Sequence, residues 1–266
     1  MTFMKIIRPG IVVSLILCAF LSACDNTRQD AATQDSVNVP LPVITVEDDI
    51  KDKEKEVTDM TDIDTEDPVQ PDPSDSFYAE EISDELFESM QGKSWPEECT
   101  MDRGDLRHLC LLYKDIDGEV HEGQMICNAR IADKLVDIFR QLYDNDYPIE
   151  RMELIDNYNG DDEASMSDNN SSCFNYRVIS GTKKLSKHAM GLAVDINPRY
   201  NPYVHSNSGT EKVEPANGAA YTDRSGDFPY KIDKEDLAYK LFTQAGFSWG
   251  GAWKSSKDYQ HFEYNK

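Results

Sequence analysis

The sequence has few basic residues and only a short apolar run near its start. It contains 27 lysines and arginines against 50 aspartates and glutamates, which gives a formal net charge of −23. A chain this acidic lacks the basic surface on which proteins bind nucleic acid, so we expect no nucleic-acid partner. The apolar run, Ile11–Leu21, is shorter than the roughly 20 residues that a membrane-spanning helix needs.

Cysteine is also scarce, and none of the six cysteines lies in a Cys-x-x-Cys pair. Structural zinc sites typically use such close pairs, so we expect disulfides or free thiols, with zinc binding by the cysteines as the alternative. Four cysteines lie beyond the first 24 residues and could form disulfides in an oxidising compartment, in any of three pairings, or remain free. They are Cys99, Cys110, Cys127 and Cys173.

Residues 1–24 have the layout of an export signal. Lys5 and Arg8 precede the apolar run, and Leu21-Ser-Ala-Cys24 closes it. Small residues before a cysteine in this position indicate a lipobox, where the signal peptide is cut before Cys24 and lipid is attached to its thiol. An ordinary signal peptide or an uncleaved anchor is the alternative. We therefore expect an exported lipoprotein, anchored to a membrane of the cell envelope, with its folded part outside the cytoplasm.

Residues 25–80 differ in composition from the rest of the chain. They include 17 acidic and 4 basic residues, few large apolar side chains and several prolines. Such a segment cannot bury enough apolar surface to offset its loss of entropy on folding, and its like charges repel one another. We expect a disordered acidic linker with a reach of about 40 Å. A tail that binds a basic partner is the alternative.

Residues 81–266 are long enough for one domain with a sizeable core. Their strand and helix patterns follow no regular β-α-β order, which predicts an α+β fold with a small, largely antiparallel sheet. One amphipathic pattern has an apolar stripe that we expect to be buried, formed by Ile131, Leu135, Ile138, Phe139 and Leu142. The expected elements are a hairpin of Arg107–Tyr113 and Gly123–Cys127 turned near Asp115–Gly118, a helix capped by Asn128 and ending near Tyr143, strands at Arg151–Asp156 and Leu192–Asn197, and a helix capped by Asp233 and ending before Gly246.

Two residues of metal-binding type flank a glycine in the stretch Ser186–Asp195. His188 offers an imidazole and Asp195 a carboxylate, a pair that catalytic zinc accepts. Gly191 allows a sharp turn between them. In the strand that follows, alternation places Asp195 on the face opposite its apolar neighbours, which we expect to enter the core.

The C-terminus supplies a third ligand of the same kind. Asp258–Tyr264 has the pattern of a short strand in which His261 and Glu263 share one face. His188, Asp195 and His261 would form a three-ligand zinc site with water in the fourth position. Asp258 could then accept a proton from that water.

These motifs resemble those of a known peptidase family. Ser-x-His-x-x-Gly-x-Ala-x-Asp, followed by Trp-Gly-Gly-x-Trp and Asp-x-x-His-x-Glu, is similar to the zinc peptidases of the VanY type. That family, peptidase family M15 of the LAS metallopeptidases, contains D-alanyl-D-alanine carboxypeptidases and the L-alanoyl-D-glutamate endopeptidases of phage endolysins. The resemblance runs from about Arg107 to Tyr264, and it implies the LAS or hedgehog-like peptidase fold with Zn²⁺ as cofactor. It includes Asp161–Met166, Phe174–Arg177 and Asp195–Pro198.

The resemblance also suggests roles for residues around the metal. It implies that Asp258 is the catalytic base and that Arg177 stabilises the oxyanion or holds a substrate carboxylate. A surface arginine paired with an acid is the alternative for Arg177. Ser186 could bind the substrate backbone or cap a helix, and Trp253 could line the substrate pocket or fill the core. Glu263 could orient a histidine ligand.

The implied activity is zinc-dependent hydrolysis of peptidoglycan stem peptides. Our first expectation is a D-alanyl-D-alanine carboxypeptidase. An L-alanoyl-D-glutamate endopeptidase is the alternative, and a non-catalytic zinc-containing module that binds the cell wall is a third possibility. The expected partners are the stem peptide and, through the lipid on Cys24, a membrane, and we expect a monomer.

A long segment, 199–232, connects the two halves of the metal site. Its prolines and glycines predict a loop, and loops of this length are usually functional or disordered, so we expect a lid or a wall of the substrate groove. Lone histidines in such positions are usually solvent-facing, which is our expectation for His205, His108 and His121. The loop tyrosines could pack on substrate or pin the loop to the domain; they are Tyr200, Tyr203, Tyr221 and Tyr230.

Overall fold

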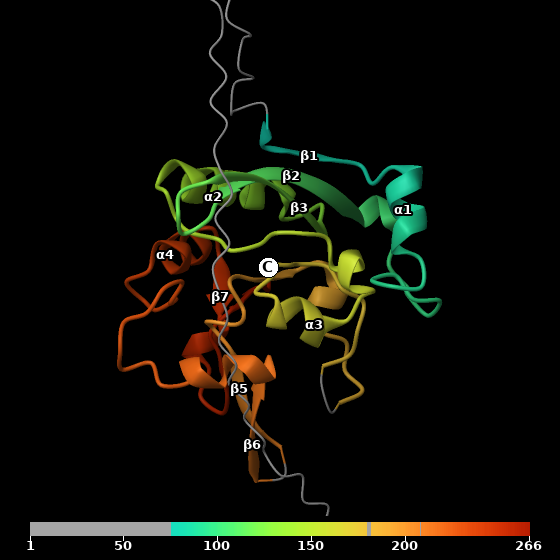
Figure 1. Ribbon diagram of the computed structural model, residues 1–266. Coiled ribbons are helices and arrows are strands. Elements are labelled where there is room, and N and C mark those ends of the chain that lie inside the picture. The colour runs from blue at the N-terminus through green and yellow to red at the C-terminus, as the bar shows by residue number, and fades with distance from the viewer. Residues whose placement is uncertain (1–75, 180–181, 208) are drawn as a thin grey trace, which may run out of the picture. The chain divides into compact units, whose positions relative to one another are not determined.

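The computed structural model describes residues 76–179, 182–207 and 209–266, which all lie in the unit Asp64–Lys266 (Figure 1). The fold is α+β, with three small antiparallel sheets and a few helices, as the sequence predicts. The predictions for the export signal, for lipidation of Cys24 and for most of the linker lie outside the described residues. Within the described ranges, no helix combines the length and the apolar character needed to cross a membrane.

The first sheet joins β1 (Tyr78–Glu80), β2 (Leu106–Lys114) and β3 (Val120–Asn128) in that order. The hairpin of β2 and β3 is confirmed, and its turn is closed by a hydrogen bond from the N–H of Gly118 to the carbonyl of Asp115. β1 lies within the range expected to be linker. It pairs with β2 because Phe77, next to it, is buried in the core, so folded structure begins before residue 81.

Helix α2 (Ala132–Asp144) packs against this sheet. Its five predicted stripe residues are all buried, which confirms that face of the helix as core. The prediction that Asn128 caps the helix is wrong, because the helix begins at Ala132. Asn128 instead accepts a hydrogen bond from the N–H of Arg130 and donates its side-chain amide to the carbonyl of Met190. It thereby ties the end of β3 to the turn that carries His188.

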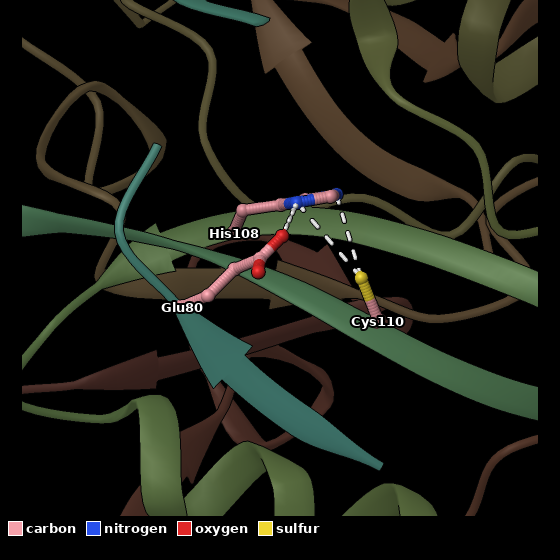
Figure 2. A group of neighbouring side chains, drawn as sticks. All are labelled: Glu80, His108 and Cys110. Atoms are coloured by element: carbon pink, nitrogen blue, oxygen red, sulfur yellow. Dashed lines mark hydrogen bonds and ion pairs between the residues drawn. The ribbon is translucent and has the colours of Figure 1, made fainter. Parts of the chain in front are cut away.

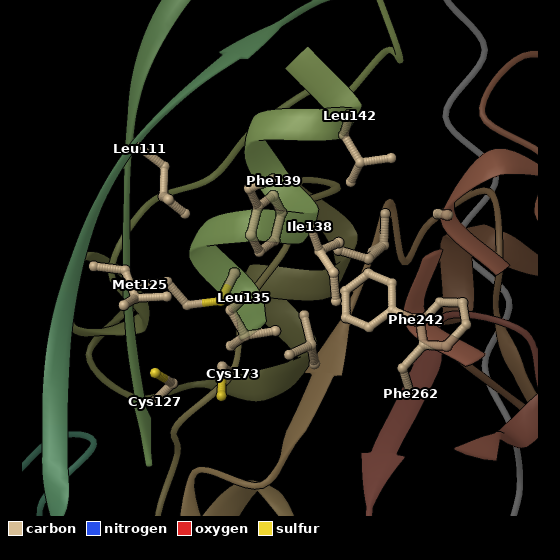
Figure 3. Packing of buried hydrophobic residues seen from close by; sticks show 14 of the residues in the cluster. Leu111, Met125, Cys127, Leu135, Ile138, Phe139, Leu142, Cys173, Phe242 and Phe262 are labelled. Atoms are coloured by element: carbon tan, nitrogen blue, oxygen red, sulfur yellow. The ribbon is translucent and has the colours of Figure 1, made fainter. Parts of the chain in front are cut away.

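The second sheet has β9 (His261–Tyr264) at its centre, between β4 (Ala193–Asp195) and β7 (Phe247–Trp249). Phe262 of β9 is fully buried and stacks on Phe242 of α4 (Leu237–Gln244), with ring centroids 4.4 Å apart (Figure 3). Burial of one such side chain contributes about 1.5–3 kcal/mol. The apolar face of β9 thus fixes the strand that presents His261 on its other face.

The third sheet lies partly within residues 199–232, so the prediction of a loop over this segment is partly wrong. β5 (Tyr203–Asn207) and β6 (Thr210–Glu214) form a hairpin there, and β5 also pairs with β8 (Lys257–Asp258). A 3-10 helix, Ala216–Tyr221, follows the hairpin. The hairpin is therefore attached to the strand that carries Asp258, with Tyr203 opposite that residue.

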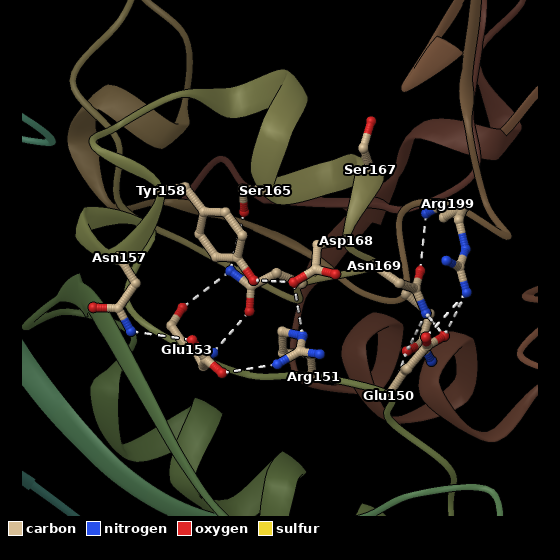
Figure 4. Close-up of polar contacts among 12 residues, drawn as sticks. Glu150, Arg151, Glu153, Asn157, Tyr158, Ser165, Ser167, Asp168, Asn169 and Arg199 are labelled. Atoms are coloured by element: carbon tan, nitrogen blue, oxygen red, sulfur yellow. Dashed lines mark hydrogen bonds and ion pairs between the residues drawn. The ribbon is translucent and has the colours of Figure 1, made fainter. Parts of the chain in front are cut away.

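The strand predicted over Arg151–Asp156 is wrong as well. The side chain of Asn170 accepts the N–H of Glu153 at 2.7 Å and donates to the Glu153 carbonyl, so side-chain bonds replace a strand ladder. Arg151 forms ion pairs with Glu153 and Asp168, each at 3.0 Å (Figure 4). A 3-10 helix, Ile155–Tyr158, leads on toward α3 (Asp162–Ser167). This polar layer holds the segment before α3 in place.

The start of α4 also differs from the prediction. Asp236 is its N-cap, and Oδ1 of Asp236 accepts the N–H groups of Ala238 and Tyr239. Asp233 instead accepts the N–H of Glu235 in the preceding turn. The predicted end before Gly246 is confirmed. The remaining helix is α1 (Asp84–Met90).

All four cysteines of the described chain are free thiols. Cys110 is opposite Gln124 and Cys127 is opposite Arg107 in the hairpin register, so these two cysteines are not cross-strand partners. Cys127 and Cys173 lie in the hydrophobic core, where burial raises the pKa of both thiols (Figure 3).

Candidate metal centre and active site

His188, Asp195 and His261 converge on one point, although the two histidines are 73 residues apart in the chain. Nε2 of His188 lies 3.2 Å from Oδ2 of Asp195, and Nδ1 of His261 lies 3.0 Å from Oδ1. The two ring nitrogens are 3.1 Å apart. All three side chains are buried. The structure therefore brings together the three residues that the sequence proposes as ligands.

The turn before β4 positions His188. His188 begins a short 3-10 helix that ends at Gly191, whose φ is +61°. A Cβ at Gly191 would also lie 2.7 Å from the backbone nitrogen of Asn128, so only glycine fits both the backbone angle and the space. The N–H of His188 donates to Oγ of Ser186 at 3.2 Å. The predicted sharp turn is confirmed.

The register of the second sheet positions the other two side chains. Asp195 on β4 is the direct partner of His261 on β9, so the two project side by side from the same face. Val194 and Phe262, the next pair, point to the opposite face and are fully buried. The alternation predicted for both strands places the carboxylate and the imidazole together.

Contacts with oxygen acceptors on the far side of each ring select the nitrogen that faces the cluster. Nδ1 of His188 donates to the carbonyl of Cys173 at 2.6 Å, which leaves the lone pair of Nε2 directed at Asp195. Nε2 of His261 lies 3.6 Å from Oε2 of Glu263, which leaves the lone pair of Nδ1 directed inward. Histidine ligands of metals are commonly oriented in this way.

The donor set fits a zinc ion. Tetrahedral zinc with bonds of about 2.0–2.1 Å separates its nitrogen and oxygen ligands by roughly 3.3 Å, close to the observed 3.0–3.2 Å. Burial alone would lower the pKa of His261. The contacts of its ring with the carboxylates of Asp195 and Glu263 outweigh burial and raise that pKa to about 10. Burial likewise raises the pKa of Asp195, and the two histidines outweigh it and hold that pKa well below its usual range. The cluster thus favours positive charge at its centre.

Asp258 lies beside this cluster and is buried. Its Oδ1 has no hydrogen-bond partner among the described residues. Burial raises the pKa of Asp258 to about 8, with Asp195 adding to the effect and His261 opposing it. A Cβ at Gly250 would lie 2.7 Å from Cβ of Asp258, so the glycine allows this close approach of the backbone.

Arg177 is paired with Asp162, with Nη2 2.7 Å from Oδ2, and both side chains are about a quarter exposed. The guanidinium also lines the pocket that contains the metal cluster. Arg177 is thus paired with an acid and also lies in the wall of the pocket. Asp162 was not predicted as a site residue. Asp161 caps α3 by accepting the N–H of Ala164, which places Asp162 in the first turn.

One pocket, of about 530 Å³, contains all the candidate site residues. Trp253 lies in its wall, with its ring centroid 5.5 Å from that of His261 and 6.5 Å from that of Tyr203. Ser186 also lines the pocket while it accepts the His188 N–H, so its observed contact is the capping type. Tyr203 and Glu214 of the β5–β6 hairpin form a further part of the wall.

The other histidines lie outside the metal cluster, but the prediction that they face solvent is wrong for two of them. The side chains of His205 and His108 are each only 12% exposed, and they face Glu214 and Glu80 respectively. His121 is 39% exposed and lies 2.8 Å from Asp115. Among the loop tyrosines, the ring of Tyr200 packs against the rings of Tyr221 and Tyr230 and so holds parts of the segment together.

Residues 180–264 match a protein-family model described as D-alanyl-D-alanine carboxypeptidase, of the M15 peptidases. The matched range contains the three candidate ligands and Asp258, and it begins just after Arg177. Searches of curated proteins and of solved structures gave no match.

Proposed function

We propose that the protein belongs to the M15 peptidase family, whose model matches residues 180–264, and that it is a zinc-dependent D-alanyl-D-alanine carboxypeptidase acting on the stem peptides of peptidoglycan. The observation that carries this proposal is the convergence of His188, Asp195 and His261 in one pocket with a guanidinium and a carboxylate, of which one oxygen has no hydrogen-bond partner in the described part of the chain. A cell-wall-binding module has no need of the last two groups.

His188, Asp195 and His261 would hold the zinc ion. When bound, zinc lowers the pKa of a water ligand and polarises a carbonyl group. The protein contributes the orientation of the ligands, through the Cys173 carbonyl behind His188 and Glu263 behind His261. These contacts fix both rings before metal or substrate arrives.

Asp258 would accept the proton of the attacking water and pass it to the leaving amine. Burial raises its pKa toward neutrality, and a group in that range can both take up and release a proton. An aspartate side chain is short, so the group must be placed closely. The pairing of β8 with β5 and the contact with Gly250 provide that placement.

Arg177 would stabilise negative charge on the substrate. Asp162 holds the guanidinium at the pocket wall, where it can bind the developing oxyanion or the C-terminal carboxylate of the stem peptide. Lys184 and Lys187 line the same pocket. Together with Arg177 they can pair with the terminal carboxylate of a stem peptide, beside the six acidic side chains that also line the pocket.

Product analysis tests the proposal. Zinc-loaded protein is incubated with purified pentapeptide muropeptides, and the products are identified by mass spectrometry. Release of free D-alanine is the expected result. Cleavage after L-alanine would replace the proposal with the endopeptidase, and intact stems that remain bound would replace it with the binding module.

We also propose that the chain is exported and anchored through lipid on Cys24, on the evidence of residues 1–24 alone. Growth with labelled palmitate should label the wild-type chain in the membrane fraction. Cys24→Ala should abolish the label, and a label that persists in this variant would contradict the assignment.

A further inference from the structure

Glu80, His108 and Cys110 form a second cluster of potential ligands, on the β1–β2–β3 sheet and outside the catalytic pocket (Figure 2). Oε1 of Glu80 lies 3.0 Å from Nδ1 of His108, and Sγ of Cys110 lies 3.9 Å from the same nitrogen. One donor atom from each residue lies within 4.8 Å of the other two. Glu80 is exposed, and the other two residues are partly buried.

Strand register places these side chains together. Glu80 of β1 is the direct partner of His108 on β2, and Cys110 lies two residues further along β2 on the same face. Leu109, between them, points to the other face and is fully buried. The cluster is therefore held by three backbone positions of one sheet.

A neighbouring amide orients the histidine. Nε2 of His108 lies 3.1 Å from Oε1 of Gln124, which accepts its hydrogen. Nδ1 then directs its lone pair at Glu80, 3.0 Å away, and two lone pairs at this distance repel unless a proton or a metal ion lies near them. The catalytic centre has the same arrangement, in which Nδ1 of His261 faces Asp195 at 3.0 Å and its outer nitrogen faces an acceptor.

We propose that Glu80, His108 and Cys110 form a second metal site, for a borderline-soft divalent ion such as zinc. A thiolate, an imidazole and a carboxylate together suit zinc and are poor ligands for magnesium or calcium. Tetrahedral zinc would separate nitrogen from oxygen by roughly 3.3 Å and nitrogen from sulfur by roughly 3.6 Å, and the observed 3.0 and 3.9 Å lie on either side of these values. The ion would link β1, which has three residues, to the long strand β2.

A third group of this kind, Asp115, Glu119 and His121, carries no such proposal. Oδ1 of Asp115 already accepts the N–H groups of Asp117 and Glu119 and so builds the hairpin turn. The group also contains no thiol.

Cobalt(II) and zinc binding to the reduced, full-length protein test the proposal. The catalytic centre contains no cysteine, so a thiolate-to-cobalt charge-transfer band in the near ultraviolet reports on the second site alone. Equilibrium dialysis counts zinc in parallel. We expect two zinc ions per wild-type chain and a clear band. Cys110→Ser should remove the band and one zinc ion, while catalytic zinc and peptidase activity remain.

Two further variants separate the site from general effects. Cys99→Ser removes another partly exposed thiol and should leave the band and both zinc ions unchanged. Glu80→Gln keeps the thiol and the fold and should weaken the second site by about ten-fold or more. A wild-type chain that binds one zinc ion without the band, or a band that survives Cys110→Ser or disappears in Cys99→Ser, would overturn the proposal.

Discussion

At the scale of the residue, Asp258 combines burial with a carboxylate oxygen that has no partner among the described residues. Asp258→Asn keeps the size of the side chain and removes its ability to accept a proton. We expect kcat to fall by about 10²–10⁴-fold. Bound zinc should stay near one ion at the catalytic centre, because Asp258 is not a proposed ligand. Release of D-alanine and metal analysis of the same sample measure the two effects.

The control for that variant is Asp233→Asn, which alters a carboxylate of a turn outside the pocket. It should leave kcat unchanged. Full activity of Asp258→Asn would show that another group takes the proton.

Asp162 permits a second prediction at this scale. Asp162→Asn removes the charge that holds Arg177, so we expect kcat/KM to fall by about ten-fold, with a smaller loss than in Arg177→Ala. Asp161→Asn is the matched control, because asparagine also caps a helix and this side chain does not contact Arg177. Steady-state kinetics on the three variants provide the comparison. Equal effects of the two aspartate variants would assign Asp162 to the stability of α3 instead.

Single residues also show what the sequence could and could not reveal. His188, Asp195 and His261 were predictable because their types suit a metal, and the two-residue period of the strands places Asp195 and His261 opposite their apolar neighbours. The carbonyl of Cys173 behind His188 was not, because any residue offers a carbonyl and only the fold selects one. The Arg177–Asp162 pair was hidden for a related reason, since the chain offers 50 acidic residues as partners.

At the scale of the element, the turn Trp249–Gly250–Gly251 sets the distance between β8 and the pocket. A methyl group at Gly250 would lie 2.7 Å from both Cβ and the carbonyl oxygen of Asp258. We expect Gly250→Ala to displace Asp258 and to lower kcat by at least ten-fold, since misplacement by about 1 Å can cost about 10²-fold. Gly226→Ala is the control, because no atom lies within 4 Å of the added methyl. Equal activities of the two variants would contradict this role of the turn.

The N-terminus of α4 carries a pH-dependent contribution to stability. Burial raises the pKa of Asp236 from 3.8 to about 6, although N–H groups of Tyr239 and Ala238 oppose the shift. The folded state therefore binds this proton more tightly than the unfolded state, and stability falls as the pH rises from about 4 to about 6. With partial exposure taken into account, the loss is about 2 kcal/mol.

Asp236→Asn tests this shift, because asparagine keeps the capping oxygen and cannot ionise. Urea unfolding at pH 4 and pH 6.5 should show a smaller loss of stability in the variant than in the wild type, by about 2 kcal/mol. The same loss in both proteins would mean that Asp236 ionises as readily in the folded chain as in the unfolded one.

Elements were predictable where a local pattern decided them. The β2–β3 hairpin has a strong turn signal, and the stripe of α2 has the helical period. The β5–β6 hairpin was missed because its strands are mainly polar and lack an alternating apolar pattern. The β5–β8 pairing was missed because β8 lies more than forty residues further along the chain and no local pattern indicates it. The predicted strand at Arg151–Asp156 failed because Asn170 supplies side-chain bonds to Glu153 in place of a strand partner.

At the scale of the whole molecule, the second and third sheets meet the turn of His188 at one pocket. The ligands come from that turn, from β4 and from β9, and the base comes from β8. The α+β class could be predicted from the mixed pattern of elements, but the division into three sheets could not, because it depends on pairings between distant strands.

The most direct test of the account is anomalous X-ray diffraction at the zinc absorption edge from crystals of the zinc-loaded protein. We predict a peak in the pocket, about 2.0–2.2 Å from Nε2 of His188, a carboxylate oxygen of Asp195 and Nδ1 of His261. A fully loaded protein that shows no peak among these three atoms, or a peak bound by other residues of the pocket, would contradict the account.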